Sequence, residues 1–265
     1  MLTRIITAIV LAVLMTAVIL FVPHNIFNGI VLLIIMGGLY EFFKLALPPE
    51  SVYREAAWIY GVCSAVSLII LKSPQVFAGV LIAGLFVISL IHMRVATTFE
   101  GTTSRIGLSV LGVVYLSATL PFWGFLHGLS HGKALIFMAI AAAAMGDTFA
   151  MFAGKAFGRH KFSPLTSPNK TMEGFFAGFV GSILSVLVVK MIGWRDLPLG
   201  HVLALGVMIG FVGPFGDLIE SMFKRDWHVK DSGTAIPGHG GILDRLDAMI
   251  FTGPAVFIYA KFFLM

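Results

Sequence analysis

Acidic residues recur at helical spacing in the last quarter of the chain. Asp217 and Glu220 are three residues apart, and Ser221 and Lys224 follow at positions i+4 and i+7 from Asp217. In an α-helix these four side chains share one face. Crowded carboxylates repel one another, and a hard cation such as Mg²⁺ binds one or two of them together with water and phosphate oxygens. The spacing therefore indicates a site for a metal-bound phosphate compound.

A second acidic pair follows within the same polar segment. Asp244 and Asp247 are also three residues apart, so one turn of helix would place them on one face. We expect the two acidic stripes to face each other, with Asp217, Glu220, Asp244 and Asp247 as candidate metal ligands. Helix capping would explain Asp244 alone. It does not explain Asp217, which lies in an apolar run where an isolated charge is costly.

Between the two stripes lies the glycine-rich run PGHGG, residues 237–241. Glycines let the backbone adopt conformations closed to other residues, and such turns can present N–H groups to phosphate. An ordinary interhelical turn is the simpler interpretation. Three roles remain open for His239: a base, a phosphate donor or a turn-stabilising residue. Charged neighbours are candidates for substrate binding, namely Lys224, Arg225, Lys230, Asp231 and Arg245.

An upstream segment carries complementary groups. Asp147 lies in an alanine-rich apolar run, and ionisable residues in such runs are functional candidates by default. Ser167 and Lys170 precede an expected helix N-terminus, which attracts phosphate. Contact to anionic lipid is an alternative explanation for the basic residues between 155 and 161. We therefore include Asp147, Ser167 and Lys170 among the substrate-binding or catalytic candidates.

The elements that must position these residues are apolar helices. Hydrophobic residues make up 58% of the 265 residues and charged residues 12%, against about 25% charged in soluble domains. The sequence predicts an all-α, polytopic integral membrane protein, because unpaired backbone groups are not tolerated in hydrocarbon. We expect about nine transmembrane helices, near 5–22, 26–43, 57–71, 76–92, 106–126, 134–154, 173–192, 201–222 and 246–264.

Charge distribution gives the expected orientation. With nine spans, 13 of the 18 Lys and Arg residues fall on the side of the N-terminus. The positive-inside rule then places the N-terminus and both motif loops in the cytoplasm, in a multi-pass protein of the inner membrane. We divide the chain into an N-terminal region, 1–126, with about five helices, and a catalytic region, 127–265. The single cysteine, Cys63, excludes an intrachain disulfide and a Cys-based metal cluster.

The polar segments resemble one known family. The run from Ser221 to Asp247, SMFKRDWHVKDSGTAIPGHGGILDRLD, is similar to the signature of phosphatidate cytidylyltransferases at over a dozen positions. The Gly146-Asp147 pair and the segment 163–174 also resemble that family. Met151 is a departure, because members often carry an aromatic residue there. The resemblance is strong over the C-terminal half and general over the first four spans.

The resemblance implies that CTP and phosphatidate react to give CDP-diacylglycerol and pyrophosphate. It assigns metal ligation to Asp217 and Asp244, with Mg²⁺ and a neighbouring K⁺. Partners are then CTP, phosphatidate, the bilayer and a second copy of the chain, with no nucleic acid. We expect a lipid phosphate oxygen to attack the α-phosphorus directly, with Lys170 and either Lys224 or Arg225 holding phosphate.

Two other functions could use some of the same residues. A CTP-dependent kinase of a membrane alcohol would use the same nucleotide but release CDP, and the complete HGG-x2-DR-x-D ending argues against it. An ion transporter would line a pathway with Asp147 and Asp217. Transporters often show repeated halves and mid-membrane broken helices. This chain has no visible repeat, and its charges collect at one face.

Overall fold

The structure, a computed structural model, describes residues 2–49, 51–235 and 240–265. The chain folds into two compact units, and each has its own core. The first unit contains Met1–Gly124 together with Asp231–Asp244, and the second contains Phe125–Lys230 and Arg245–Met265. The polar segment that precedes the last helix thus contributes to both units.

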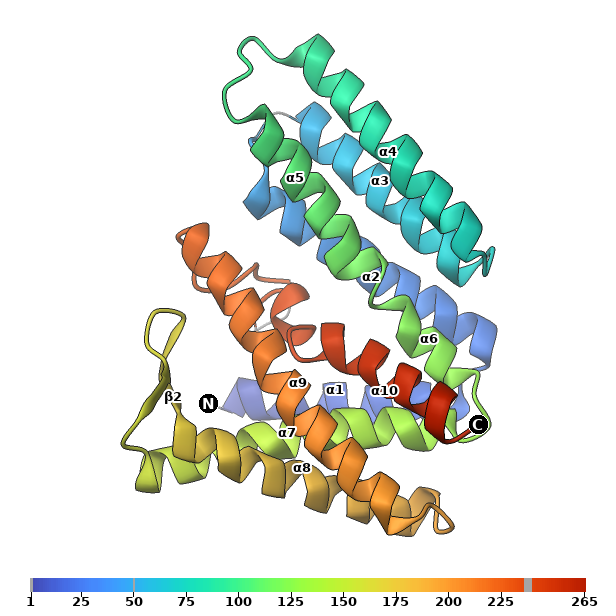
Figure 1. The fold of residues 1–265 in the computed structure, drawn as a ribbon, viewed down its shortest axis with the longest axis vertical. Coiled ribbons are helices and arrows are strands. Elements are labelled where there is room, and N and C mark those ends of the chain that lie inside the picture. Colours follow the sequence, from blue (N-terminus) through green and yellow to red (C-terminus); the bar gives the residue numbers. More distant parts are fainter. Residues whose placement is uncertain (1, 50, 236–239) are drawn as a thin grey trace. The chain divides into compact units, whose positions relative to one another are not determined.

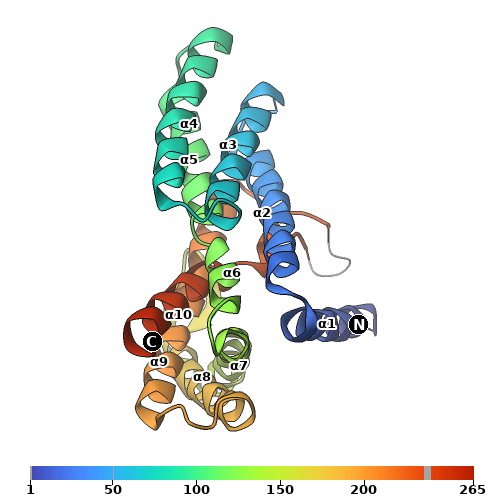
Figure 2. The ribbon, with the colours of Figure 1, turned by 90° about the vertical axis from the view of Figure 1, so that its right-hand side faces the viewer.

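The first unit is a group of helices (Figures 1 and 2). α2 packs against α3, α5 and η1, and α3 packs against α4. Phe42 and Phe43 of α2 are buried in its core, with their rings edge to face at 5.5 Å. Gly112 faces both rings, so its missing side chain is what lets α2 and the end of α5 approach closely. The elements are α1 (Leu2–Phe21), α2 (His24–Ala46), α3 (Ser51–Ile69), α4 (Pro74–Val95), α5 (Thr102–Gly112) and the π-helical η1 (Val113–Ser117).

The expected fifth span is not one regular helix. α5 passes into η1, and a new helix, α6 (Pro121–His127), begins at Pro121 and leads into the second unit. Proline has no backbone N–H and clashes with the preceding turn, so it is favoured at the first position of a helix and disfavoured inside one. Pro121 therefore explains why one apolar run forms separate helical segments.

The second unit is built on a close pair of helices, α7 and α8. Gly146 of α7 lies against Gly178 and Ser182 of α8, and the Ser182 hydroxyl donates to the Ala142 carbonyl at 2.9 Å. Small residues and interhelical hydrogen bonds of this kind are typical of packing in membranes. The elements are α7 (Gly132–Phe157), β1 (Lys161–Ser163), β2 (Ser167–Thr171), α8 (Met172–Gly193), α9 (Leu199–Asp226) and α10 (Met249–Phe263). The residues of the 3-10 helix η2 (Leu243–Arg245) are divided between the two units.

A short hairpin interrupts the helices where the sequence suggested a loop. β1 and β2 pair antiparallel, with Lys161 opposite Thr171 and Ser163 opposite Ser167. Thr171 then caps α8, because its side-chain oxygen accepts from the Gly174 N–H at 3.1 Å. The hairpin thus places Lys170 beside the first turn of α8.

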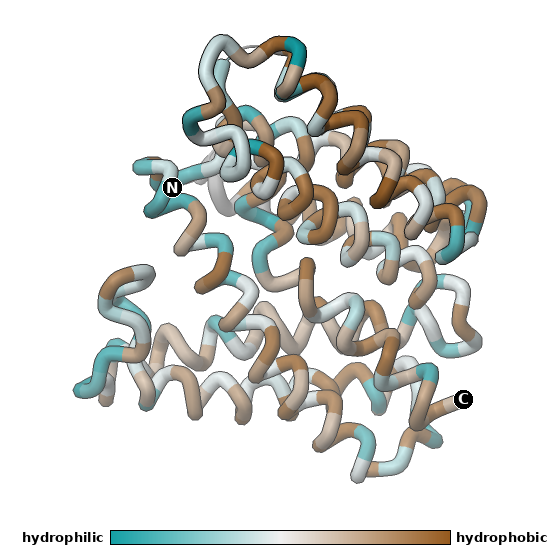
Figure 3. Tube along the Cα trace, turned by 45° about the horizontal axis from the view of Figure 1, so that its top comes forward, coloured by the Kyte–Doolittle hydropathy of each residue, from teal (hydrophilic) through white to brown (hydrophobic). Residues whose placement is uncertain are grey.

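The predicted fold class is confirmed: the described chain is mainly helical and is a multi-pass membrane protein. Figure 3 shows hydrophobic residues along the helices and hydrophilic residues mainly at their ends. Within the described part, six helical segments are long and apolar enough to cross a membrane. Shorter apolar helices lie at Ile9–Phe21 and Met249–Phe263. The expected count of nine spans is not confirmed. The six segments are α2, α4, Thr102–His127, α7, α8 and α9.

Candidate active site

The clearest polar contact of the second unit joins Lys170 of β2 to Asp217 of α9. The Lys170 Nζ lies 2.6 Å from the Asp217 Oδ2 and 3.3 Å from the Pro214 carbonyl. Ser221, one turn further along α9, donates to the other Asp217 oxygen at 3.3 Å. The two charged side chains keep 26% and 30% of their surface exposed. An ion pair that remains accessible to solvent can exchange partners with a charged ligand.

Further carboxylates of the same unit surround this pair. Asp247 lies in the turn before α10, where its Oδ1 accepts from the Ala248 N–H at 2.7 Å. Burial, followed by the nearby charge of Asp217, raises the pKa of Asp247 from 3.8 to about 6, and Asp147 adds to this effect. Negative charge is therefore concentrated here, and a bound cation would relieve it.

The close approach of α9 to the Asp247 turn depends on a glycine. A Cβ at Gly216 would overlap the Asp247 carbonyl oxygen. Any other residue at position 216 would push the backbone around Asp247 away from α9. The glycine before Asp217 is thus needed to bring the two carboxylates into one region.

Glu220 has a different setting from its neighbour Asp217. Its side chain is completely buried, and Lys224 pairs with its Oε1 at 2.9 Å across one helical turn. A buried carboxylate needs such a partner, because an uncompensated charge is costly. The four residues of the first acidic stripe therefore form two i, i+4 pairs on α9, Asp217 with Ser221 and Glu220 with Lys224.

Asp244 lies in the first unit, at the centre of a hydrogen-bonded loop. It is 8% exposed, its Oδ2 accepts from the Ser232 N–H and the Gly241 N–H, both at 2.8 Å, and the Ser232 hydroxyl oxygen lies 2.9 Å from the same atom. Asp244 belongs to η2 and Asp247 to the following turn. The spacing predicted that the two residues share one face of an α-helix. That prediction is wrong, because no continuous α-helix contains both of them.

Sequence reasoning missed one residue of this loop, Glu41 of α2. Its carboxylate is 6% exposed and accepts from the N–H groups of Ile242 at 3.0 Å and Leu243 at 2.9 Å. It also accepts from the Ser232 hydroxyl at 3.0 Å. The available signal was a lone acid within the apolar run 26–43, the same signal that singled out Asp147.

The other candidates lie at the surface or outside the described residues. His239 lies outside them, so its three roles stay open. Ser167 starts β2, and the Arg225 Nε donates to the Thr166 carbonyl of the same hairpin at 3.5 Å. Three further candidates are exposed: Lys230, Asp231 and Arg245. Because Asp217 and Asp244 belong to different units, the expectation that the two acidic stripes face each other stays a prediction.

The described residues contain no group of three or more His, Cys, Asp or Glu side chains arranged to hold a metal ion. A fully protein-made metal cage is therefore not seen in this part of the chain. Mg²⁺ ordinarily uses only one or two carboxylates and completes its shell with water and substrate phosphates. Asp217 and Asp247 provide donors of that hard, oxygen type within one unit.

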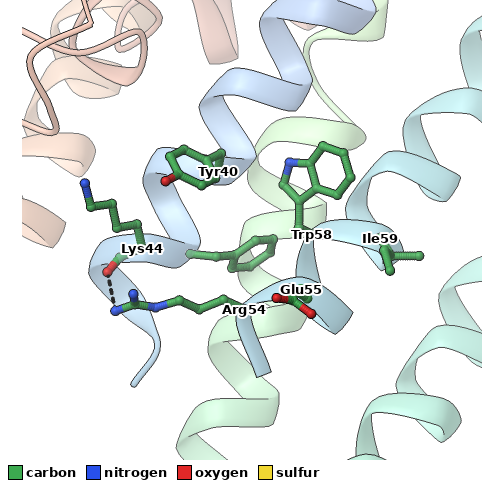
Figure 4. Close-up of a pocket in the computed structure, with 7 residues that line it drawn as sticks. Tyr40, Lys44, Arg54, Glu55, Trp58 and Ile59 are labelled. Carbon is green, nitrogen blue, oxygen red and sulfur yellow. Dashed lines mark hydrogen bonds between the residues drawn. The ribbon is translucent and has the colours of Figure 1, made fainter. Parts of the chain in front are cut away.

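A separate recess lies between α2 and α3 in the first unit (Figure 4). None of the candidate residues lines it. Its arginine, Arg54, donates to the Leu47 carbonyl at 2.9 Å and to the Lys44 carbonyl at 2.9 Å. Arg54 thereby satisfies carbonyl groups at the C-terminus of α2. The recess is lined by Tyr40, Phe43, Lys44, Arg54, Glu55, Trp58 and Ile59.

Comparison with known proteins identifies the family. The model of the cytidylyltransferase family matches residues 2–263, nearly the whole chain. The chain belongs to the cytidylyltransferase family. The predicted membership and the assignment as an enzyme that transfers nucleotidyl groups are therefore confirmed. The match also covers the N-terminal helices, where the sequence resemblance was only general.

Several curated members of the family are similar to this chain. A phosphatidate cytidylyltransferase of Staphylococcus epidermidis is 37% identical over 74% of this chain and 77% of its own length. One of Staphylococcus aureus is 34% identical over 90% of this chain and 93% of its own length. Phosphatidate cytidylyltransferase 5, chloroplastic, of Arabidopsis thaliana is 47% identical over 51% of this chain and 35% of its own length.

Proposed function

We propose that this protein transfers CMP from CTP to phosphatidate, giving CDP-diacylglycerol and pyrophosphate. The observation that carries the proposal is the accessible Lys170–Asp217 ion pair among further carboxylates at the polar ends of apolar helices. The names of the relatives support the substrates. A lipid whose chains remain in the bilayer needs only to bring its phosphate to the ends of the helices.

The reaction that we propose is a direct displacement. A phosphate oxygen of phosphatidate attacks the α-phosphorus of CTP, a new P–O bond forms, and the bond to the β-phosphate oxygen breaks. The Lys170 ammonium breaks its ion pair with Asp217 and binds a phosphate oxygen. Arg225, further along α9, adds positive charge. Catalysis then consists mainly of positioning and of compensating charge in the transition state.

The proposed metal site uses carboxylate oxygens. Asp217 and Asp247 fit a hard cation, because Gly216 lets α9 approach the Asp247 turn closely and both side chains offer carboxylate oxygens. We include Asp244 among the proposed metal ligands because of its place in the sequence motif. Mg²⁺, when bound, would neutralise charge on the phosphates of CTP. K⁺ and a homodimer are carried over from the resemblance as further proposals.

Labelled nucleotide tests the proposed reaction. With purified protein, phosphatidate and Mg²⁺, a radiolabel at the α-phosphate of CTP should enter the lipid, and a radiolabel at the γ-phosphate should appear in pyrophosphate. A CTP-dependent kinase would instead place the γ-label on lipid and release CDP. Lipid labelled from the γ-position would therefore overturn the proposal. Neither a kinase nor an ion transporter is favoured by the relatives.

We further propose that the hairpin and the Lys170 site face the cytoplasm. Leu165, at the hairpin tip, is 94% exposed, and Asp196, between α8 and α9, is also exposed. In a Cys63→Ala background, Leu165→Cys should resist an impermeant maleimide in intact cells and react after permeabilisation. Asp196→Cys should react in intact cells. The reverse labelling pattern would invert the proposed topology.

A further inference from the structure

Glu41 uses both oxygens of its carboxylate on one loop of the first unit. The Oε1 accepts from the Ile242 N–H, and the Oε2 accepts from the Leu243 N–H and the Ser232 hydroxyl, all between 2.9 and 3.0 Å. A buried carboxylate is costly unless hydrogen bonds compensate for lost water. Among the described residues, the donors that compensate Glu41 come from the loop that leads to Asp244, so that loop is tied to helix α2.

Ser232 couples Glu41 to Asp244. Its hydroxyl lies 3.0 Å from the Glu41 Oε2 and 2.9 Å from the Asp244 Oδ2, and it accepts from the Asp244 N–H at 3.3 Å. Ser232 also fixes Asp244 through its own N–H at 2.8 Å. A displacement of the Glu41 carboxylate would therefore change the position of both the serine and Asp244.

The glycines of the loop are required by the same contacts. A Cβ at Gly241 would overlap the Ser232 hydroxyl and the Glu41 carboxylate, and a Cβ at Gly233 would lie 2.8 Å from the Glu41 Oε1. Gly240 has φ of +82°, a left-handed conformation that favours glycine. These glycines let the loop close around two carboxylates, which is a reason for their presence besides phosphate contact.

We propose that Glu41 is a positioning residue for Asp244. It sets the conformation of residues 240–244 through two backbone N–H groups and through Ser232, and so fixes the position of the Asp244 carboxylate. The inference rests on the proposed function, because Asp244 matters to the reaction only if this chain transfers CMP. The hydrogen bonds that Glu41 makes within the described part of the chain go to Ser232, Ile242 and Leu243, so it acts through Asp244.

The test compares Glu41→Gln with Glu55→Gln. The glutamine side chain would keep the size of the glutamate but replace one acceptor oxygen with an amide group that cannot accept from a backbone N–H. Glu55 is an exposed acid of α3 in the same unit, so its change serves as the matched control. Two quantities are measured: hydrogen exchange of peptides covering 240–246 without substrate, and the Mg²⁺ dependence of the steady-state kinetics of CMP transfer.

For Glu41→Gln we expect exchange of residues 242–243 to accelerate about tenfold, as for the loss of one charge-assisted hydrogen bond. We also expect half-activation to require about tenfold more Mg²⁺ and kcat to fall about tenfold, with the KM for phosphatidate unchanged. Glu55→Gln should match the wild type in all of these quantities. A purely structural role would lower the amount of active protein without moving the Mg²⁺ requirement.

Wild-type exchange, or a wild-type Mg²⁺ requirement, in Glu41→Gln would overturn the inference. If that variant fails to fold, Ser232→Ala replaces it, because it keeps the backbone contacts of Glu41 and removes the coupling to Asp244. Ser232→Ala must then shift the Mg²⁺ requirement in the same direction, and a wild-type value would again overturn the inference. Failure of the wild-type protein to transfer CMP would refute the proposed function, whereas the exchange result would still report on Glu41.

Discussion

Asp217→Asn is expected to lower kcat about 10³-fold, equivalent to roughly 4 kcal/mol of transition-state stabilisation. The change keeps the shape of the side chain and removes the charge that pairs with Lys170 at 2.6 Å. It also removes a carboxylate that we assign to the cation. Turnover should be measured at saturating Mg²⁺ with purified protein in detergent.

The loss should come from chemistry rather than unfolding. Asp217 is partly exposed, so its neutralisation removes a charge without opening a cavity in the core. Thermal unfolding in detergent should therefore remain close to that of the wild type. Asp196→Asn, which neutralises an exposed acid in another loop, should leave kcat unchanged. Wild-type turnover in Asp217→Asn would remove Asp217 from the site.

Lys170→Ala should lower kcat/KM about 10²- to 10³-fold, the range found when one well-placed group that stabilises transition-state charge is removed. The Lys170 ammonium forms an ion pair with Asp217, and Lys170 immediately precedes Thr171, the N-cap residue of α8. Its removal deprives the phosphates of a cation and leaves the Asp217 charge uncompensated. The KM for CTP and the KM for phosphatidate, measured separately, will show which phosphate Lys170 holds.

Lys161→Ala is the matched control for this prediction. Lys161 lies in the paired strand of the same hairpin, where its Nζ donates to the Pro168 carbonyl at 2.7 Å. Its loss should change kcat/KM by less than about threefold, because an exposed hydrogen bond contributes little. Equal, small losses in both variants would assign Lys170 to lipid contact rather than catalysis.

Much of the second-unit site could be predicted from residue types. Asp217 was chosen because an isolated charge in an apolar run is costly, and Lys170 because it precedes a helix N-terminus, which attracts phosphate. The sequence did not show that they touch. That contact depends on the hairpin, which turns the chain so that Lys170 reaches a helix 44 residues away, at Pro214. Strands as short as β1 and β2 leave a weak sequence signal.

Glu41 was missed for a different physical reason. Its partner Ser232 is 191 residues away, and no spacing rule relates such positions. A lone acid near the end of an apolar run also suits a simple interfacial position, so the residue gave no reason to prefer a role. Only the folded loop shows that its carboxylate meets three donors. The sequence left the glycines of residues 237–241 open between phosphate contact and an ordinary turn, and it did not show that Gly240 and Gly241 lie against carboxylates.

The apolar pattern predicted helices well, and the number of membrane spans that it suggested is not confirmed. Apolar periodicity reports that a segment avoids water, and it does not report whether that segment crosses a bilayer. α3 is an example. It contains the charged residue Arg54, whose side chain donates a hydrogen bond to the Leu47 carbonyl at the end of α2. Pro121 similarly divides a run that hydropathy alone treats as continuous.

The most direct test of direct transfer is isotope exchange between labelled pyrophosphate and CTP with phosphatidate rigorously absent. We expect no exchange, because the lipid supplies the attacking oxygen and no nucleotidyl-enzyme forms. Cys63 lies on α3, outside both motif segments, and Cys63→Ala should retain full activity. Exchange at a rate near turnover would contradict direct attack and show that a side chain of the protein accepts CMP before the lipid does.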